Sequence, residues 1–192
     1  MKGKLGLFGG TFNPIHIGHL RLAEDVREEF AIDRVVFIPT HIPPHKKVEV
    51  EVGSTHRLAM VRLAISANER FMCDDIELKR GGISYTIDTI DYVYGSYQFT
   101  GKPFFIIGSD LYHELGMWKD IEAIKEKVDF IVLLRENWPL SSQESSPFFY
   151  FTKRVLDITS SEVRKRIAKG KSIRYLVTDD VLHYINKEKL YT

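Results

Sequence analysis

Two histidines three residues apart are the first residues in the chain whose types and spacing indicate chemistry. His16 and His19 lie in GLFGGTFNPIHIGHL, residues 6–20, with Gly18 between them. Residues three apart on a helix share one face, and each imidazole can donate a hydrogen bond to a phosphate oxygen. Without a carboxylate in the segment they make a poor metal-ligand set. The pair therefore predicts contact with a polyphosphate; the alternative is a pair of ordinary surface histidines.

The residues before the histidines predict an anion site at the start of a helix. Gly9 and Gly10 end an apolar run, and glycine lets the backbone turn sharply and lets a ligand come close. Asn13 can cap a helix and Pro14 has no amide donor, so we expect a helix from about His16 whose first N–H groups are unpaired and point outward. Such a helix end attracts anions.

A second anion site is predicted in DITSSEVRKRIAKG, residues 157–170. Thr159 and Glu162 form a capping pattern and Gly170 is a stop signal, which together predict a helix. The hydroxyls at its start and an arginine one turn later can bind phosphate; these residues are Ser160, Ser161 and Arg164. From the sequence alone, a well-capped surface helix is the alternative. Thr178 predicts the cap of one further helix.

Apolar runs alternate with helical patterns along the chain, and this alternation positions the two motifs. We expect strands at 4–8, 34–39, near 71, 103–108 and 129–134, and helices at 17–30, 55–68 and 84–95. The pattern predicts an α/β fold with a doubly wound parallel sheet, whose ligand crevice lies at the carboxyl ends of the strands. Three loops interrupt the alternation of strands and helices: 39–55, 136–147 and 108–118. We expect a short helical turn in 108–118.

Length and composition indicate one domain of ordinary globular character. The chain has 192 residues, 44% hydrophobic and 28% charged, with a net charge of +1, so we expect a single domain over residues 1–192. The balanced charge argues against general nucleic-acid binding. No run is long enough to cross a bilayer, and the single cysteine, Cys73, allows neither an internal disulfide nor a thiolate zinc site. We expect a cytoplasmic protein whose oligomeric state, a homo-oligomer included, is left open.

The two motifs together carry a family resemblance. GGTFNP followed by HIGH resembles the first signature of the nucleotidyltransferase superfamily with the HxGH motif, and ITSSEVR resembles its second, Ile-Ser-Ser-Thr-x-x-Arg, with Ser161 where threonine is more frequent. The resemblance implies a Rossmann-like fold of the nucleotidyltransferase type, with a C-terminal helical part from about residue 158 completing the ATP site. It implies catalytic roles for His16, His19 and Arg164. The implied ATP-binding residues are Gly9, Gly10, Thr11, Phe12, Gly18, His45, Lys46, Gly108, Asp110, Ser160 and Ser161.

Four further stretches are similar to bacterial nicotinate mononucleotide adenylyltransferases: PPHK, GGISYTIDT, GSDLYHELGMW and GKSIRYLVTDDVLHYINKEKLY. This similarity covers nearly the whole chain. It implies transfer of the adenylyl group of ATP to nicotinate mononucleotide in NAD biosynthesis, with Mg²⁺ carried by ATP and no metal site built by the protein. The nicotinate ring needs an aromatic face and a few donors for its carboxylate. The implied nicotinate mononucleotide-binding residues are Ser84, Tyr85, Thr86 and Trp118.

Several alternatives stay open from the sequence. Taken alone, Trp118 and Tyr85 are also typical of core packing, and Asp110 of a helix cap. His45 and Lys46 either cover the phosphates or form a solvated basic turn. Pantetheine-phosphate adenylyltransferases share the first motif, but they are shorter and lack the SYTIDT and tryptophan segments. An enzyme that prefers the amide, or a nucleotide sensor without catalysis, also fits; the short chain disfavours an aminoacyl-tRNA synthetase.

Overall fold

Six parallel strands form the central sheet of the protein, in the order β3-β2-β1-β4-β5-β6. The computed structural model describes residues 3–44, 52–134, 145–152 and 156–192. The order reverses between β1 and β4, so the ligand crevice of a doubly wound sheet falls at the carboxyl ends of these two strands. The predicted α/β class is confirmed. The strands are β1 Leu5–Gly10, β2 Arg34–Pro39, β3 Phe71–Cys73, β4 Phe104–Gly108, β5 Asp129–Leu133 and β6 Phe148–Phe151.

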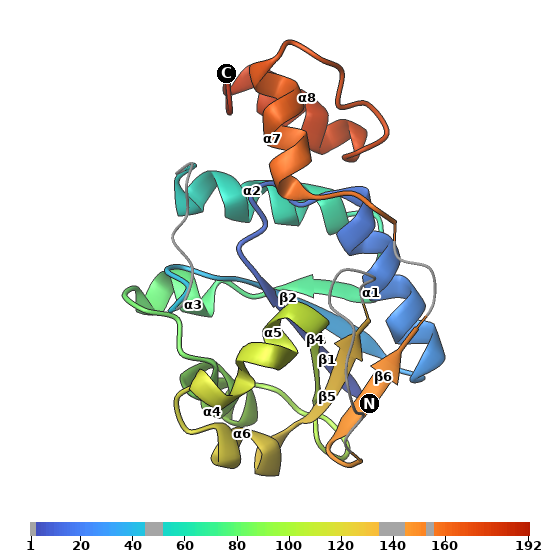
Figure 1. Cartoon of the computed structure of the whole chain (residues 1–192), viewed down its shortest axis with the longest axis vertical. Helices are drawn as coiled ribbons and strands as arrows, with labels where there is room; N and C mark the ends of the chain where they lie inside the picture. The colour runs from blue at the N-terminus through green and yellow to red at the C-terminus, as the bar shows by residue number, and fades with distance from the viewer. Residues whose placement is uncertain (1–2, 45–51, 135–144, 153–155) are drawn as a thin grey trace.

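Helices cover both faces of the sheet (Figure 1). Helices α1 and α2 lie on one face, α4, α5 and α6 on the other, and α7 and α8 lie together beyond α2. The helices are α1 Ile17–Glu29, α2 Ser54–Ile65, α3 Ile76–Arg80, α4 Thr86–Ser96, α5 Ser109–Glu114, the 3-10 helix η1 Leu115–Met117, α6 Ile121–Lys127, α7 Ser160–Ala168 and α8 Asp179–Lys187.

Alternating side chains on the strands build two hydrophobic layers. Phe37 of β2 and Ile106 of β4 belong to one layer, which also contains residues of α1 and α2, whereas their neighbours Val36 and Ile107 belong to the other, with residues of α4 and α6. This follows from the two-residue period of a strand. The first layer continues into the C-terminal part through Val181 of α8. The C-terminal helices therefore share a core with the sheet, and the described residues form one domain.

One strand is missing from the sequence prediction, although the others lie within a few residues of their expected bounds. β6 is four residues long and lies at the edge of the sheet. Its Phe149 is 41% exposed, and neither a helical pattern nor an alternation marks the segment. Its four aromatic residues favour a strand, but the run is short, and pairing with β5 makes it a strand.

The predicted helix signals near the C-terminus are confirmed. Thr159 Oγ1 accepts a hydrogen bond from the Glu162 amide at 3.1 Å, and Thr178 Oγ1 accepts one from the Val181 amide at 3.4 Å. Gly170 follows the end of α7 with φ of 63°, the left-handed conformation that favours glycine at a helix end. These caps fix where α7 and α8 begin.

Candidate active site

The loop between β1 and α1 carries the first motif, and its turn falls at Phe12. Phe12 has φ of 48°, in the left-handed region, whereas Gly9 and Gly10 are the last residues of β1. The prediction that the glycines supply the turn is therefore wrong. Gly10 is needed for space instead, because a Cβ there would lie 3.0 Å from the Phe12 ring. That ring is buried and packs edge-on against Phe8, with 5.7 Å between centroids.

His16 and His19 stack against each other at the start of α1, as their spacing predicts. Their ring centroids lie 3.6 Å apart, and the ring planes are inclined by 29°. His16 is buried and directly precedes the helix. Gly18 permits this arrangement because a Cβ at that position would lie 3.0 Å from His16 Nδ1. His19 also packs edge-on against Phe12, with 5.2 Å between centroids, so its ring has little freedom to move.

A backbone hydrogen bond fixes the tautomer of His19. The N–H of His16 donates to His19 Nδ1 at 3.2 Å. A neutral imidazole carries its proton on one nitrogen only, so an accepting Nδ1 leaves the proton on Nε2. The ring therefore offers an N–H donor at its distal nitrogen. This donor is the group that the motif can present to a phosphate.

Two amides at the start of α1 are already used within the protein. The Ile17 N–H donates to the carbonyl of Leu176 at 2.8 Å, and the His19 N–H donates to the carbonyl of His16 at 3.0 Å. The expectation that the first amides are unpaired and point outward is therefore wrong for these two groups. Leu176 lies far along the chain, and a carbonyl from such a distant segment is invisible to local sequence reasoning. These two amides are therefore not available to an anion as the structure stands.

The second motif docks directly on the first. Asn13 was expected to cap α1, but its side-chain oxygen accepts from the Tyr191 hydroxyl at 2.6 Å. The carbonyl of Asn13 accepts from Arg164 Nη1 at 2.8 Å. The hydroxyl of Ser160 donates to the carbonyl of Pro14 at 2.8 Å. The fold thus brings together two motifs that lie 146 to 151 positions apart in the sequence.

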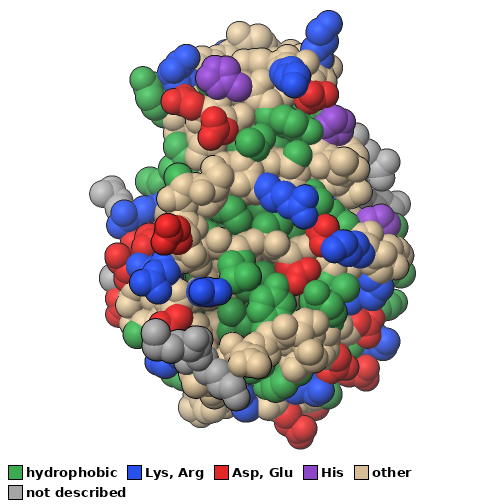
Figure 2. Space-filling view, turned by 180° about the vertical axis from the view of Figure 1, so that it is seen from behind, with side chains coloured by type: hydrophobic (Ala, Val, Ile, Leu, Met, Phe, Trp, Pro, Cys, Tyr) green, Lys and Arg blue, Asp and Glu red, His purple; other side chains and the backbone are tan. Residues whose placement is uncertain are grey.

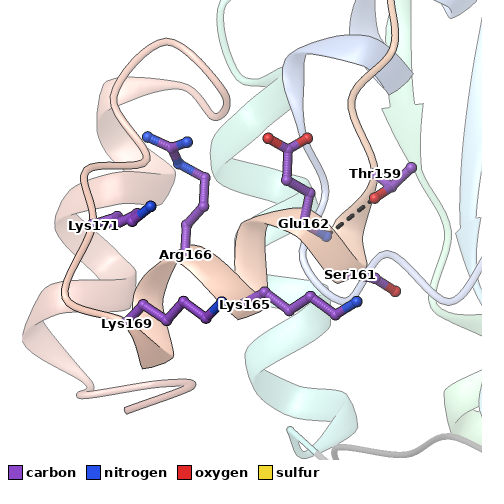
Figure 3. A pocket seen from close by; sticks show the side chains of 7 residues that line it. All are labelled: Thr159, Ser161, Glu162, Lys165, Arg166, Lys169 and Lys171. Carbon is purple, nitrogen blue, oxygen red and sulfur yellow. Dashed lines mark hydrogen bonds between the residues drawn. The ribbon is translucent and has the colours of Figure 1, made fainter.

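These contacts change what the second motif can offer to a ligand. The Ser160 hydroxyl already donates its proton to the motif loop. Arg164 also donates to Ser161 Oγ at 3.2 Å. Because a guanidinium has five N–H groups, Arg164 keeps others that can bind an anion. Ser161 is exposed at the rim of a surface pocket of about 330 Å³ and lies on the same side of α7 as Lys165 (Figure 3). The pocket is lined by Thr159, Ser161, Glu162, Lys165, Arg166, Lys169 and Lys171.

Arg57 holds the motif loop from α2, and the sequence analysis did not identify it. Its guanidinium donates to the carbonyl of Thr11 at 2.7 Å and to that of His41 at 3.4 Å. The residue is buried, and burial lowers the pKa of its guanidinium. The signal that could have found it is its spacing, because Arg57 shares a helix face with the buried Met60 and Val61. A charge within an apolar stripe indicates a buried contact.

The carboxyl end of β4 lies beside the motif strand because β1 and β4 pair in parallel. Gly108 ends β4 and is the N-cap of α5, and Asp110 lies in the first turn of that helix. The alternative in which Asp110 is the cap is therefore wrong. Both residues therefore lie at the carboxyl-end edge of the sheet, which is also where the loop from β1 to His16 begins.

The segment expected to receive the nicotinate ring lies at the start of α4. Tyr85 is the N-cap and Thr86 is the first helical residue. Ser84 is buried, accepts from the His41 amide with its hydroxyl at 3.0 Å and donates its own amide to the Ile42 carbonyl at 2.9 Å. The loop after β2 is thereby joined to the start of α4. Arg57 also contacts this loop at His41, and it contacts the motif loop at Thr11. The segment predicted to bind ATP and the segment predicted to bind nicotinate mononucleotide are therefore connected.

Trp118 belongs to the hydrophobic layer beneath α4 and α6. Its half-buried ring packs edge-on against Phe105 and Phe130, with centroids 6.0 and 6.5 Å away. Lys119 Nζ lies 4.8 Å from the centroid of the Tyr85 ring. This contact brings the end of η1 next to the start of α4. Trp118 therefore has both a packing role and an exposed part.

Two predicted residues, His45 and Lys46, lie outside the described residues, so the structure places neither. Within the ranges that it does describe, no three His, Cys, Asp or Glu side chains gather where they could hold a metal ion. The helices among these residues include none long and apolar enough to cross a membrane. Over the face in Figure 2, acidic and basic side chains are interspersed, in agreement with the balanced charge of the sequence.

Comparison with known proteins identifies the class to which this fold and site belong. A family model described as cytidylyltransferase-like matches residues 7–166. Two solved structures of a Plasmodium falciparum nicotinic acid mononucleotide adenylyltransferase, complexed with NaAD and with APC, have TM-scores of 0.76 and 0.74 at 20% and 19% identity. Each alignment covers 98% of this chain and 97% of the other. The chain belongs to the cytidylyltransferase-like family.

Relatives with higher sequence identity show which group within this family the chain belongs to. Proteins of Citrifermentans bemidjiense and Geobacter sulfurreducens are 41% and 40% identical to this chain, with 98% of both chains covered in each case. A protein of Borrelia garinii is 38% identical, over 98% of this chain and 94% of its own. All three are named nicotinate-nucleotide adenylyltransferase. The chain is a member of the nicotinate-nucleotide adenylyltransferases.

Proposed function

We propose that the protein transfers the adenylyl group of ATP to nicotinate mononucleotide, which gives nicotinate adenine dinucleotide and pyrophosphate, as a step of NAD biosynthesis. The observation that carries the proposal is the stacked pair of His16 and His19 at the end of β1, with α7 docked against the same loop. The names of the relatives support the choice of acceptor.

On the ATP side, both imidazoles contact the triphosphate, and the Nε2–H of His19 donates where charge develops at the α-phosphorus. Arg164 and Lys46 stabilise the leaving pyrophosphate. The C-terminal helical part from about residue 158 completes this site, and the hydrogen bond from Arg164 to the Asn13 carbonyl supports that assignment. The other residues proposed to bind ATP are Gly9, Gly10, Thr11, Phe12, Gly18, His45, Gly108, Asp110, Ser160 and Ser161.

The attacking group in this reaction brings its own negative charge. A phosphate monoester has a second pKa of about 6, so it is largely dianionic at neutral pH and needs no general base. One of its oxygens forms a bond to the α-phosphorus while the bond to pyrophosphate breaks, so the protein has to align the groups and stabilise charge. Positioning two bound reactants supplies about 7 to 11 kcal/mol of the barrier.

Magnesium arrives with ATP in this proposal, held mainly by phosphate oxygens. When bound, it neutralises part of the triphosphate charge. Next to the phosphates, His19 and Arg164 supply N–H donors.

On the acceptor side, the carboxylate of nicotinate binds at the start of α4, near the amide of Thr86. The Tyr85 amide was expected to be unpaired as well, but it donates to the Ile83 carbonyl at 3.1 Å. The positive end of the helix dipole favours a negative group there. The exposed part of Trp118 receives the cationic ring. Ser84 contributes by joining the loop after β2 to this helix start. The arrangement favours the acid over the amide, which has no charge to place there.

Pyrophosphate release with a panel of acceptors tests this function. The protein is mixed with ATP, Mg²⁺ and either nicotinate mononucleotide, its amide, or phosphopantetheine. We expect release with the acid to be at least about tenfold faster than with the amide, because a hydrogen bond to a charged group contributes about 1.5–3 kcal/mol. Faster turnover of the amide would refute the carboxylate site. ATP that binds but is never consumed would refute the enzyme, whereas a chelator should stop turnover without unfolding the protein.

A further inference from the structure

The side chain of Tyr191 reaches the first motif from far along the chain. Its hydroxyl donates to Asn13 Oδ1 at 2.6 Å, across 178 positions of sequence. Asn13 is 4% exposed, so water has little access to this hydrogen bond, and a hydrogen bond in a low-dielectric environment is electrostatically stronger. The contact therefore restrains the loop that leads into His16.

The phenol of Tyr191 is a hydrogen-bond donor at neutral pH. Burial raises the pKa of Tyr191, and the positive charges of Arg164 and Arg57 oppose this with a smaller effect. A protonated phenol has one hydrogen to donate, and here that hydrogen lies on the bond to Asn13. Tyr191 is consequently unsuited to acid or base chemistry. The preceding Leu190 is buried in the hydrophobic layer, which anchors the segment.

The short loop at Thr11–Pro14 is held by several distant parts of the chain. Three of its carbonyls accept hydrogen bonds from α2 and α7; the pairs are Arg57 with Thr11, Arg164 with Asn13, and Ser160 with Pro14. Tyr191 adds a bond to the side chain of Asn13. Since the loop runs directly into His16, and His16 stacks on His19, the position of the loop sets the position of both imidazoles.

We propose that Tyr191 is a positioning residue for adenylyl transfer, acting through Asn13 on the loop that ends at His16. This inference rests on the function proposed above. A misplacement of about 1 Å lowers a rate by about 10²-fold. Removal of the hydroxyl alone leaves the ring, the guanidinium contacts and the Ser160 contact in place. The loss of rate in a variant without this hydroxyl should therefore be smaller than about 10²-fold.

Tyr191→Phe, with Tyr184→Phe as the matched control, tests the proposal. The Tyr184 hydroxyl also lies in the C-terminal part, but it bonds His56 Nδ1 at 2.9 Å instead of the motif loop. We expect Tyr191→Phe to lower kcat about tenfold, with KM for both substrates changed less than about twofold. Tyr184→Phe should leave kcat unchanged. An unchanged kcat in Tyr191→Phe, or equal losses in the two variants, would overturn the proposal.

A second measurement does not depend on the reaction. The ring ¹⁵N signals of His16 and His19 report the tautomer and hydrogen bonding of each imidazole. We expect these signals to shift in Tyr191→Phe and to stay in place in Tyr184→Phe. If the wild-type protein released no pyrophosphate, the proposed function would fail, yet this comparison would still test the positioning role. Unshifted signals in Tyr191→Phe would refute that role.

A double-mutant cycle tests whether the hydroxyl acts through Asn13. In an Asn13→Ala background the acceptor of the Tyr191 hydroxyl is gone, so Tyr191→Phe should lower kcat no further. An undiminished tenfold loss in that background would show that the hydroxyl acts elsewhere and would overturn the proposed route.

Discussion

Replacement of His19 by two different residues separates its two roles. His19 Nδ1 accepts from the His16 amide at 3.2 Å, and the distal Nε2–H is the donor proposed to face the α-phosphate. His19→Ala removes both functions. His19→Asn keeps a side-chain oxygen close to the place of Nδ1 and removes the distal donor. The two variants should therefore be equally impaired in catalysis and differ in stability.

The size of each effect follows from the contacts. Loss of one preorganised donor lowers the rate about 10²- to 10³-fold, or about 2.7–4 kcal/mol of transition-state stabilisation. Both variants also lose the ring contact with Phe12, worth about 0.5–1.5 kcal/mol beyond buried area. Only His19→Ala loses the acceptor at the helix start, which costs about 1 kcal/mol.

Two measurements check this reasoning. Pyrophosphate release gives kcat/KM for each variant, and urea unfolding gives the free energy of unfolding. A kcat/KM near wild type in either variant would contradict the role of Nε2. Equal stabilities of His19→Ala and His19→Asn would contradict the assigned acceptor role of Nδ1, and with it the tautomer.

Three further predictions concern other parts of the site. Trp118→Ala should raise KM for nicotinate mononucleotide about thirtyfold, because a desolvated cation–π contact is worth about 2 kcal/mol, and leave KM for ATP unchanged in initial-rate assays. Arg57→Lys should lower the free energy of unfolding by about 1.5–3 kcal/mol in urea titrations, since an ammonium cannot span both carbonyls. Burial raises the pKa of Glu77 above 4.5, so wild-type stability falls as pH rises through 4.5 towards the folded-state pKa. Glu77→Gln should therefore gain stability relative to wild type between pH 4 and 7, and Glu24→Gln should lose it, because Arg27 lowers the pKa of Glu24.

The sheet was largely predictable because its strands are buried on both faces. RVVFIP and PFFIIG are continuous apolar runs between helical patterns, which is typical of parallel strands, and both form strands within a residue of the predicted bounds. β6 was not predicted because it is only four residues long, lies at the edge of the sheet and shows no alternation of apolar and polar residues. Its Phe149 is exposed, and its pairing with β5 is a long-range contact.

The site was predictable where its geometry is local. The spacing of His16 and His19 predicted that the two rings lie side by side, and they stack, although His16 is the N-cap and not a helical residue. The start of α7 follows from its capping pattern. The partners of the motif loop were not predictable in the same way. Arg57 and Tyr191 contact residues 46 and 178 positions away, and no period or cap in the sequence encodes such a distance.

The docking of α7 and α8 on the motif loop ties activity to the least local contacts of the fold. Proteins open in parts, and regions held by few contacts open at lower free energy than a paired sheet. If these two helices detach, the loop loses Ser160, Arg164 and the Leu176 carbonyl at once, while the six strands can stay paired. We therefore expect detachment of these helices to disrupt the motif loop before the sheet melts.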